Sequence, residues 1–514
     1  MEPSSLLQYG FAAESEPDVR VKQARPKADD EEQQRITDAF IDSGILLSGL
    51  AVDIIKERRI KPAGVIESAR QKGLFLVTKE FIEEFFPEEK KEEFTFVVKR
   101  GKPAAASQVE ARLEMDKDKD ITGNSTSEGT IENFVSLFRD RYKRLKEVLT
   151  NRVSLRDVID IGNIDKYQNQ EVKIIGMITD LRKSKNGNLI IDLEDTTGSA
   201  IVIDSSDAGK KSMLVNDEVI GVIGNVKGEL VLAKEIIEPD IPMIKEQPVC
   251  EDPISMAFLS DIHVGSNLFK ESEFEKFLNW LNRSGDGARK DIAESIKYVF
   301  IAGDLVDGIG IYPGQESELS IPDIYKQYDY LGKLLEKIPS YVEIIISPGN
   351  HDAVRRAEPQ PSLQEFLEPL VKLPNVHLVS NPARVKAHGF DVLMYHGTSL
   401  DAMIASLSQL SYSKPEQAQI EYLKKRHLSP IYGTKEQIAP EEKDYLAIDF
   451  VPDIFHCGHV HKNGYANYRG VKVINSGTWQ AQTDFQQQQG HIPTPCQVPI
   501  LDMRSLQLSV VNFN

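Results

Sequence analysis

Apolar residues near the start of the chain recur with a helical period. Between residues 36 and 86 they fall every three or four positions, and the breaks KPAG and KG divide the pattern into short segments. This pattern predicts a small helical domain over residues 31–86. Residues 1–30 are polar without such a period, so we expect disorder there. Residues 87–130 contain KPAAAS, DKDKD and TGNSTSEGT, and this composition predicts a flexible charged linker.

Residues 131–165 are predicted to form an amphipathic helix and a connection. Apolar side chains lie three or four residues apart at Phe134, Phe138, Tyr142, Leu145 and Leu149. Basic side chains lie between them at Arg139, Arg141, Lys143, Arg144 and Lys146. This basic face is suited to phosphates or to an acidic partner, but a solvated helix face explains the pattern at least as well.

The middle of the chain changes to the period of a β-strand. Over residues 166–245, short alternating runs are separated by hairpin signals at Asn186-Gly187 and Lys227-Gly228. About five short strands in this length predict a small closed barrel, and the segment resembles an OB-fold. Its strands carry almost no aromatic residues, so we expect a structural or protein-contact role and not base stacking.

From residue 254 to 514 the pattern is that of an α/β domain. Nearly continuous apolar runs such as ISMAFLSD, YVFIAGD and VEIIISPGN alternate with longer helical stretches. Apolar strands separated by helices are typical of sheets that are buried on both faces. Catalytic residues are then expected in the loops at the strand ends.

Composition narrows the class of protein. A chain of 514 residues is long enough for several domains, and its formal net charge of −18 argues against a protein that coats nucleic acid. Without a long uncharged apolar run or a basic-then-apolar N-terminus, we expect a cytoplasmic protein with no membrane contact. The three cysteines are widely spaced, which favours reduced, buried thiols.

Potential metal ligands follow five of the predicted strands. They are Asp261 and His263 in LSDIHVGS, Asp304 in IAGDLVDG, Asn350 and His351 in SPGNHD, His396 in MYHG, and His459 and His461 in CGHVH. In an extended chain, residues i and i+2 project to the same side, so each D-x-H or H-x-H pair can point into one site. Mixed carboxylate and imidazole ligands with a bridging oxygen donor are what a pair of divalent ions needs.

In this order the motifs resemble the calcineurin-like metallophosphoesterase superfamily, with D-x-H, G-D-x-x-[DG], G-N-H-[DE], a single H and G-H-x-H over residues 254–480. The resemblance implies a β-sandwich flanked by helices, holding two divalent ions, with Mn²⁺ expected ahead of Mg²⁺. It implies that Asp261, His263 and His461 hold the first ion, that Asp304 bridges, and that Asn350, His396 and His459 hold the second. His351 is then the acid that protonates the leaving oxygen, oriented by Asp352. Asp307 is expected to cap a turn, and His456 to be structural.

Three further segments narrow the resemblance. GIGIYPGQE at 308–316, RRAEPQP at 355–361 and KKRHLSPIYG at 424–433 are similar to the small subunits of archaeal family D DNA polymerases. This resemblance implies a role in DNA replication, a 3′–5′ exonuclease, a large catalytic polymerase subunit as partner, and DNA bound as a single strand or a primer 3′ end. Gln507, Val510 and Phe513 have the spacing of a degenerate motif that binds a sliding clamp. An alternating final strand is the favoured interpretation of the same residues.

Two other functions stay open. A stand-alone phosphoesterase acting on small phosphoesters uses the same ligands, although the barrel and the basic insert 414–435 argue against it. A non-catalytic polymerase scaffold is the other alternative. The complete ligand set argues against a scaffold, but ligands can also be kept because bound metal stabilises a fold.

Overall fold

The computed structural model describes residues 31–57, 60–86, 103–206, 209, 212–243, 245–282, 289–364, 366–367 and 372–514. The chain divides into two compact units, Met1–Gly101 and Lys102–Asn514. Each is described by itself below. The predicted disorder over residues 1–30 lies outside the described residues.

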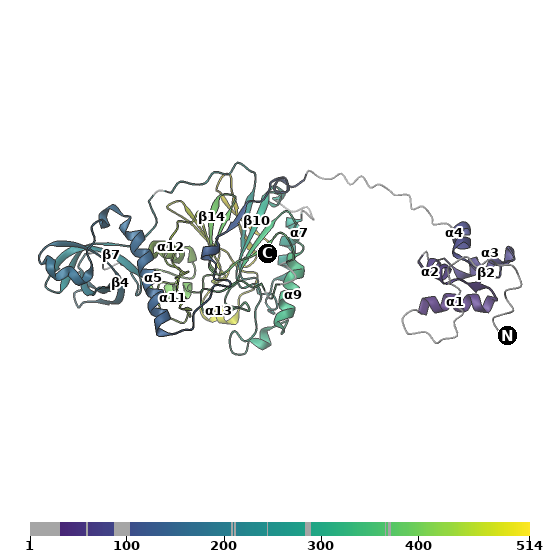
Figure 1. Cartoon of the computed structure of the whole chain (residues 1–514), viewed down its shortest axis with the longest axis horizontal. Helices are drawn as coiled ribbons and strands as arrows, with labels where there is room; N and C mark the ends of the chain where they lie inside the picture. The colour runs from purple at the N-terminus through teal and green to yellow at the C-terminus, as the bar shows by residue number, and fades with distance from the viewer. Residues whose placement is uncertain are drawn as a thin grey trace. The chain divides into compact units, whose positions relative to one another are not determined.

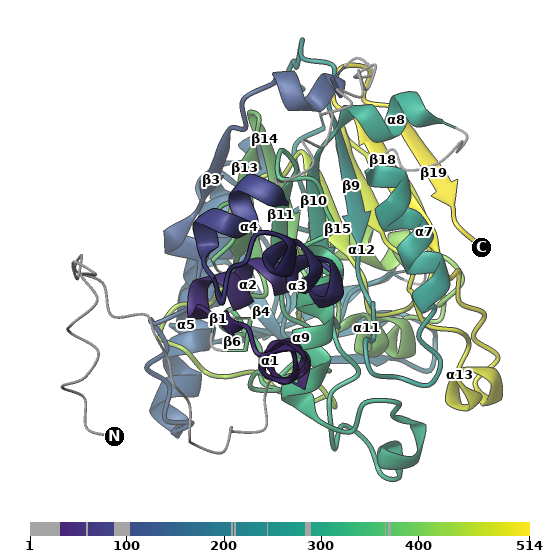
Figure 2. The ribbon, with the colours of Figure 1, turned by 90° about the vertical axis from the view of Figure 1, so that its right-hand side faces the viewer.

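The N-terminal unit contains four short helices around a two-stranded parallel sheet (Figure 2). The helices are α1 (Glu31–Ser43), α2 (Gly49–Glu57), α3 (Pro62–Gln71) and α4 (Lys79–Phe85), and the strands are β1 (Leu46–Leu47) and β2 (Leu76–Val77). Helix α3 begins at a proline, which is favoured at the first helical position. Phe40, Ile55 and Ile82 are buried between the helices, so the helical period of the sequence matches the observed core.

The second unit contains a closed five-stranded barrel, at the left of Figure 1. Its strands are β4 (Glu171–Lys183), β5 (Leu189–Glu194), β6 (Ser199–Asp204), β7 (Val219–Lys227) and β8 (Leu230–Ile237), in the order β4-β5-β6-β8-β7. Along β5, Leu189, Ile191 and Leu193 are buried and alternate with less buried residues. The prediction of a closed barrel is confirmed, and none of these strands carries an aromatic residue.

Beside the barrel lie two six-stranded sheets. The first has the order β12-β11-β10-β9-β18-β19, with β9 (Ser255–Leu259), β10 (Ile296–Ala302), β11 (Glu343–Ser347), β12 (Val376–Leu378), β18 (Gln497–Asp502) and β19 (Leu508–Asn512). The second has the order β16-β17-β15-β14-β13-β3, with β3 (Leu113–Met115), β13 (Ala383–Ala387), β14 (Phe390–Met394), β15 (Ile454–Cys457), β16 (Gly464–Tyr468) and β17 (Val471–Asn475). One core cluster takes Phe258 and Phe300 from the first sheet and Met394 and Ile474 from the second, so the sheets pack face to face.

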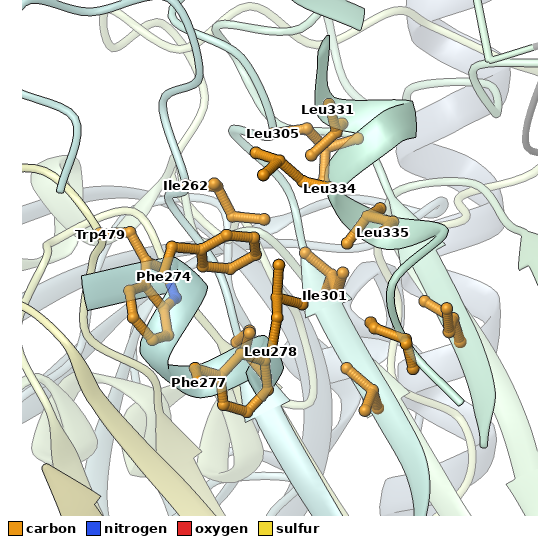
Figure 3. Packing of buried hydrophobic residues seen from close by; sticks show 14 of the residues in the cluster. Ile262, Phe274, Phe277, Leu278, Ile301, Leu305, Leu331, Leu334, Leu335 and Trp479 are labelled. Atoms are coloured by element: carbon orange, nitrogen blue, oxygen red, sulfur yellow. The ribbon is translucent and has the colours of Figure 1, made fainter. Parts of the chain in front are cut away.

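Helices cover the outer faces of both sheets. On the first sheet lie α7 (Glu271–Leu281), α8 (Lys290–Ser295) and α9 (Ile324–Leu335), and Figure 3 shows Leu278 of α7 and Leu335 of α9 beside Ile301 of the sheet. On the second lie α11 (Leu400–Ser406) and α12 (Pro415–Lys425). The short helix α13 (Asp484–Gln488) comes late in the chain. The unit is therefore a mixed α/β structure, as the strand and helix pattern predicts.

The prediction of a flexible linker over residues 87–130 is wrong for residues 103–130. Residues 87–102 lie outside the described residues, whereas 103–130 pack against the sheets. Strand β3 pairs antiparallel with β13, the 3₁₀ turns η3 (Ala105–Gln108) and η4 (Lys117–Lys119) flank it, and Lys119 Nζ lies 2.5 Å from Asp449. Composition indicates only whether a segment can fold by itself. This one gains its hydrogen bonds and ion pairs from the edge of an existing sheet.

Much of the predicted basic face of helix α5 (Ile131–Thr150) is not free for DNA. A capping box at Thr130 and Asn133 begins the helix. Arg141 is fully buried and donates to the Asp444 carboxylate at 2.9 Å and to the Pro430 carbonyl at 3.0 Å. Arg144 is held by Asp140 and Asp449. The short turns η5 (Val153–Leu155) and η6 (Ile161–Tyr167) then lead to the barrel.

The basic insert 414–435 is likewise partly internal. Lys425 of α12 is fully buried, and its Nζ lies 3.0 Å from Glu218 and 3.1 Å from Glu238, both contributed by the barrel segment, and 3.5 Å from Glu421. Burial raises the pKa of Glu218 to about 8, although the ammonium opposes that shift. The lysine therefore joins the barrel to the α/β core instead of contacting phosphates.

The chain ends in a strand, as favoured from the sequence. Phe513 follows β19 and packs against Phe277, Trp280 and Trp479. The burial of Phe513 argues against the clamp-binding interpretation of this segment, because its aromatic anchor lies in the core. Among the described residues, no helix has the length and apolarity needed to cross a membrane.

Replacing the buried Lys425 tests whether its ion pairs hold the barrel to the α/β core. Lys425→Met should lower the free energy of unfolding by about 3–5 kcal/mol, because the buried carboxylates of Glu218 and Glu421 and the partly exposed one of Glu238 lose their cation. The matched control is Lys234→Met, which breaks an exposed pair with Glu171 and should leave the denaturant midpoint near wild type. Chemical denaturation followed by tryptophan fluorescence and circular dichroism measures both. Equal denaturant midpoints for the two variants would contradict this stabilising role of Lys425.

Candidate metal centre

The predicted ligands come together at one edge of the two sheets. Asp261 follows β9, Asp304 follows β10 and Asn350 follows β11, and these three strands run parallel in the first sheet. His396 follows β14 and His459 follows β15, which are parallel in the second sheet. Because the sheets pack face to face, the carboxyl ends of all five strands meet.

The backbone is bent at these strand ends. Positive φ angles occur at Asp261 (50°), His263 (53°), Asp304 (50°), His459 (69°) and His461 (53°). Each such angle costs a residue with a side chain about 1–2 kcal/mol. Gly303 and Gly349 flank Asp304 so closely that a Cβ on Gly349 would lie 2.3 Å from its Oδ1. The fold therefore accepts strain and close packing in order to hold the polar side chains together.

Asp261, His263 and His461 form the first group. Their ligand atoms lie within 4.8 Å of one another, and the Nε2 atoms of the two histidines are 3.0 Å apart. His263 donates its Nδ1–H to the carboxylate of Asp307 at 3.0 Å. In the neutral ring the Nε2 lone pair of His263 therefore points toward His461.

Asp304, His396 and His459 form the second group, with the same spacing. His396 donates Nδ1–H to the Ala302 carbonyl at 2.8 Å, which leaves Nε2 facing the Asn350 Oδ1 at 2.9 Å and the Asp304 Oδ2 at 3.3 Å. Burial acts to lower the pKa of His396, but the charges of Asp304 and Asp261 outweigh it and raise the pKa to about 10. The group thus attracts a positive charge.

The donor set fits two divalent ions. Around His396 a ring nitrogen, an amide oxygen and a carboxylate oxygen face one another, and with a neutral ring all three are acceptors, so the group needs either a proton on Nε2 or a metal cation between them. Asp304 Oδ2 lies 3.3 Å from His396 in the second group and 3.8 Å from His263 in the first. The structure thus gathers all seven sequence-predicted ligands, with Asp304 between the two groups.

A second layer of side chains orients these ligands. Asp307 is buried and, besides His263, accepts from the amides of Gln315 and Gln480 at 3.1 Å. The expectation that Asp307 merely caps a turn is therefore wrong. The His459 Nε2 lies 3.3 Å from Asp401, and the Gln486 amide lies 2.9 Å from His461 Nδ1. Such partners fix ring orientation in metal sites.

Asp307, Asp401 and Gln486 each contact a candidate ligand, but only Asp307 was part of a sequence motif, as the second acid of G-D-x-x-D. Asp401 and Gln486 belong to no motif identified in the sequence, and only the fold brings them to the ligands.

His351 lies beside the metal-binding groups. Its Nδ1–H donates to the Asp307 carbonyl at 2.8 Å, and its backbone N–H donates to Asp304 Oδ1 at 2.8 Å. Its ring centroid is 4.7 Å from that of His263. Burial lowers the pKa of His351 although the Asp304 charge opposes this, so the ring gives up a proton readily. Nε2 remains for proton exchange.

Asp352 does not orient His351, contrary to the prediction. Its carboxylate accepts from the backbone N–H groups of Gly349 at 2.8 Å and Leu305 at 3.3 Å, and from the Tyr328 hydroxyl at 3.0 Å. Burial and the nearby Asp304 raise the pKa of Asp352 to about 7. The side chain turns back into the loop, so it fixes the backbone on which Asn350 and His351 lie.

His456, which we expected to be structural, belongs to neither ligand group and is linked to Asp261 only through Ser476 and Ser260. His456 Nε2 contacts the Ser476 hydroxyl at 2.9 Å, and burial lowers the pKa of this ring to about 3. The three cysteines are free and buried, as expected for reduced thiols.

Comparisons with known proteins identify relatives of this chain. The family model of the B subunits of DNA polymerases alpha and epsilon matches residues 256–465. The DNA polymerase II small subunit of Methanocaldococcus jannaschii is 46% identical over 406 residues, covering 77% of this chain and 68% of its own length. That of Methanothermobacter thermautotrophicus is 39% identical over 481 residues, covering 91% and 98%. A solved archaeal phosphodiesterase is 14% identical, with a TM-score of 0.26, and covers 50% of this chain and 99% of its own.

The relatives match most of the length of this chain at identities well above 30%, and the resemblance predicted from the motifs is confirmed. The chain belongs to the family of archaeal DNA polymerase II small subunits.

Proposed function

We propose that this chain is a 3′–5′ exonuclease that hydrolyses phosphodiester bonds at DNA ends within a replicative DNA polymerase. The observation that carries the proposal is the position of Asp304 between two groups of buried or partly buried candidate ligands. Asp261, His263 and His461 would hold one ion, and Asn350, His396 and His459 the other, with Mn²⁺ as the expected metal. Two bound cations supply Lewis acidity and lower the pKa of a bound water.

The protein's own residues have distinct roles in this proposal. Asp304 balances the charge of both sites, and Asp307, Asp401 and Gln486 fix the histidine rings. His351 protonates the leaving 3′-oxygen through Nε2, because its Nδ1–H is committed to the Asp307 carbonyl. Asp352 holds the loop and exchanges no proton with the substrate.

A catalytic centre is favoured over a scaffold. Bound metal alone could stabilise the strand ends, but stability does not require a histidine that lies beside the ligands with its Nδ1–H held by the Asp307 carbonyl and its Nε2 left for a proton. A phosphoesterase for small substrates stays the second candidate, because the ligands are the same in both. The attached barrel, which we propose to be an OB-fold over residues 166–245, favours a role in a larger assembly.

We also propose that a large catalytic subunit supplies most of the grip on DNA. The chain carries a net charge of −18, and burial of Arg141, Lys425 and Arg426 removes basic groups from both segments that looked suited to phosphates. On α5, Arg139 and Lys143 stay exposed. We retain residues 31–86, 131–165, 166–245 and 254–514 as the proposed domains, with residues 103–130 added to the last.

Replacing the bridging carboxylate tests the central claim. Asp304→Asn should lower metal affinity and the rate of DNA degradation with Mn²⁺, each by about 100-fold or more, because one carboxylate neutralises both cations. Asp192→Asn, in the barrel, is the matched control and should change neither. Metal analysis and single-stranded DNA digestion are the measurements. Full metal content in Asp304→Asn would contradict the bridge, and a metal-loaded wild type that leaves DNA intact would favour a scaffold.

His351→Ala should separate acid catalysis from metal binding. We expect the exonuclease rate to fall by about 100-fold or more while metal content is unchanged, since the ring donates a proton and holds no ion. Hydrolysis of thymidine 5′-(p-nitrophenyl) phosphate should fall much less, because nitrophenolate leaves without protonation. His377→Ala, a partly exposed histidine paired with Glu343, is the control. Equal losses on both substrates would argue against the acid role.

The dependence on a partner is measured by titrating DNA with salt. The isolated chain should bind single-stranded DNA weakly, with a log–log salt slope on the order of −1 to −3, because few phosphate contacts are available. The chain co-expressed with the large subunit should bind at least about tenfold more tightly at the same salt concentration. The dependence is refuted if the chain alone binds as tightly as the pair near physiological salt.

A further inference from the structure

An exposed tyrosine lies directly beside the proposed acid. Tyr312 is 37% exposed, and its ring centroid is 6.5 Å from that of His351 at an interplanar angle of 60°. Ile309, from the same loop, is 42% exposed. The loop that carries them, residues 308–316, follows β10 and has no lysine or arginine. It cannot grip phosphates, so the group it offers next to the reaction centre is an aromatic face.

Hydrogen bonds from buried side chains fix the backbone of loop 308–316. The buried Gln315 donates to the Asp307 carbonyl at 2.8 Å and accepts from the Ile311 N–H at 2.9 Å. The buried Gln327 accepts from the Gly308 N–H at 2.9 Å, and Arg356 donates to the Gly310 carbonyl at 3.0 Å. The Tyr312 hydroxyl donates at 3.0 Å to Glu318, the last residue of the short turn η7 (Gln315–Glu318). The ring is therefore preorganised at low entropic cost, as a binding platform requires.

A second exposed ring occurs next to another residue of the site. Phe485 of α13 is 71% exposed, and its neighbour Gln486 contacts the ligand His461. A capping box between Thr483 and Gln486 fixes the helix start. Residues 484–490 again contain no lysine or arginine. In Figure 2, α13 and the loop that leads into α9 both lie on the lower side of the second unit.

We infer that Tyr312 and Phe485 form an aromatic rim that stacks unpaired bases at the 3′ end of the substrate strand. This inference rests on the proposed exonuclease function. Single-stranded nucleic acid is held by stacking on exposed aromatic rings, and the barrel strands of this chain have none. The rim supplies the missing platforms beside residues of the metal centre. A base in duplex is already stacked and paired, so frayed or mismatched 3′ ends are the preferred substrates.

The binding test removes the base and the ring separately. Two single-stranded oligonucleotides differ only in their last two nucleotides, which carry either normal bases or abasic sites. With metal removed by EDTA, the wild-type full-length chain should bind the normal end about fivefold or more tightly, a factor that matches one stacked base. In Tyr312→Ala and Phe485→Ala the ratio should fall toward one, whereas Tyr312→Phe should keep it. Phe75→Ala, which removes a 70% exposed ring from the N-terminal unit, should also keep it.

Cleavage rates distinguish failure of the rim from failure of the exonuclease. With Mn²⁺, Tyr312→Ala should cleave the normal end about fivefold or more slowly than wild type, and the abasic end at the wild-type rate. A wild type that cleaves neither end defeats the exonuclease proposal. A base-to-abasic binding ratio unchanged in both alanine variants overturns the rim. Loss of co-purification with the large subunit in Phe485→Ala, with the ratio intact, would make Phe485 a protein contact and overturn its role here.

Discussion

The structure depends on the cost of burying several ligands around Asp304. Two carboxylates, an amide oxygen and four imidazoles lie at one sheet edge, where at least three acceptor atoms face one another at about hydrogen-bond distance. Such a group is unfavourable unless positive charge is bound. The negative charges of Asp304 and Asp261 therefore raise the pKa of His396, which favours a proton on this ring when no metal is bound. The strained backbone at the strand ends and the second layer of Asp307, Asp401 and Gln486 both serve to hold this arrangement.

The fold can hold such a site because two sheets and their helices fix the strand ends on both sides. Alternate residues of β10 illustrate this: Tyr298 and Phe300 pack between the sheets, while Val299 and Ile301 pack under α7 and α9. A strand buried on both faces cannot shift its register without losing either contact. Asp304, two residues after β10, is therefore positioned by a rigid element, and the loop with Tyr312 is anchored to the same point through Asp307.

Charge has two separate uses in this chain. Basic residues that the composition offered for nucleic acid are placed inside, where Arg141 joins α5 to Asp444 and Lys425 joins the barrel segment to α12. These pairs define how the parts of the second unit fit together, since a buried ion tolerates few arrangements. The remaining surface is acidic overall. In the function proposed above, contact with DNA is left to the metal centre, to stacking and to a partner.

The sequence by itself determined the local features: the helical and strand periods, the closed barrel and the α/β alternation. It also indicated candidate metal ligands at the strand ends, and the family resemblance assigned a set of seven. Only the tertiary structure decided what depends on distant neighbours. Residues 113–115 form an edge strand, and Arg141 and Lys425 are buried. Asp352 bonds the backbone of its own loop and not His351, whereas Asp307 bonds His263. The physical reason is that spacing fixes a side chain relative to its own strand, whereas burial and hydrogen-bond partners come from chain segments hundreds of residues away.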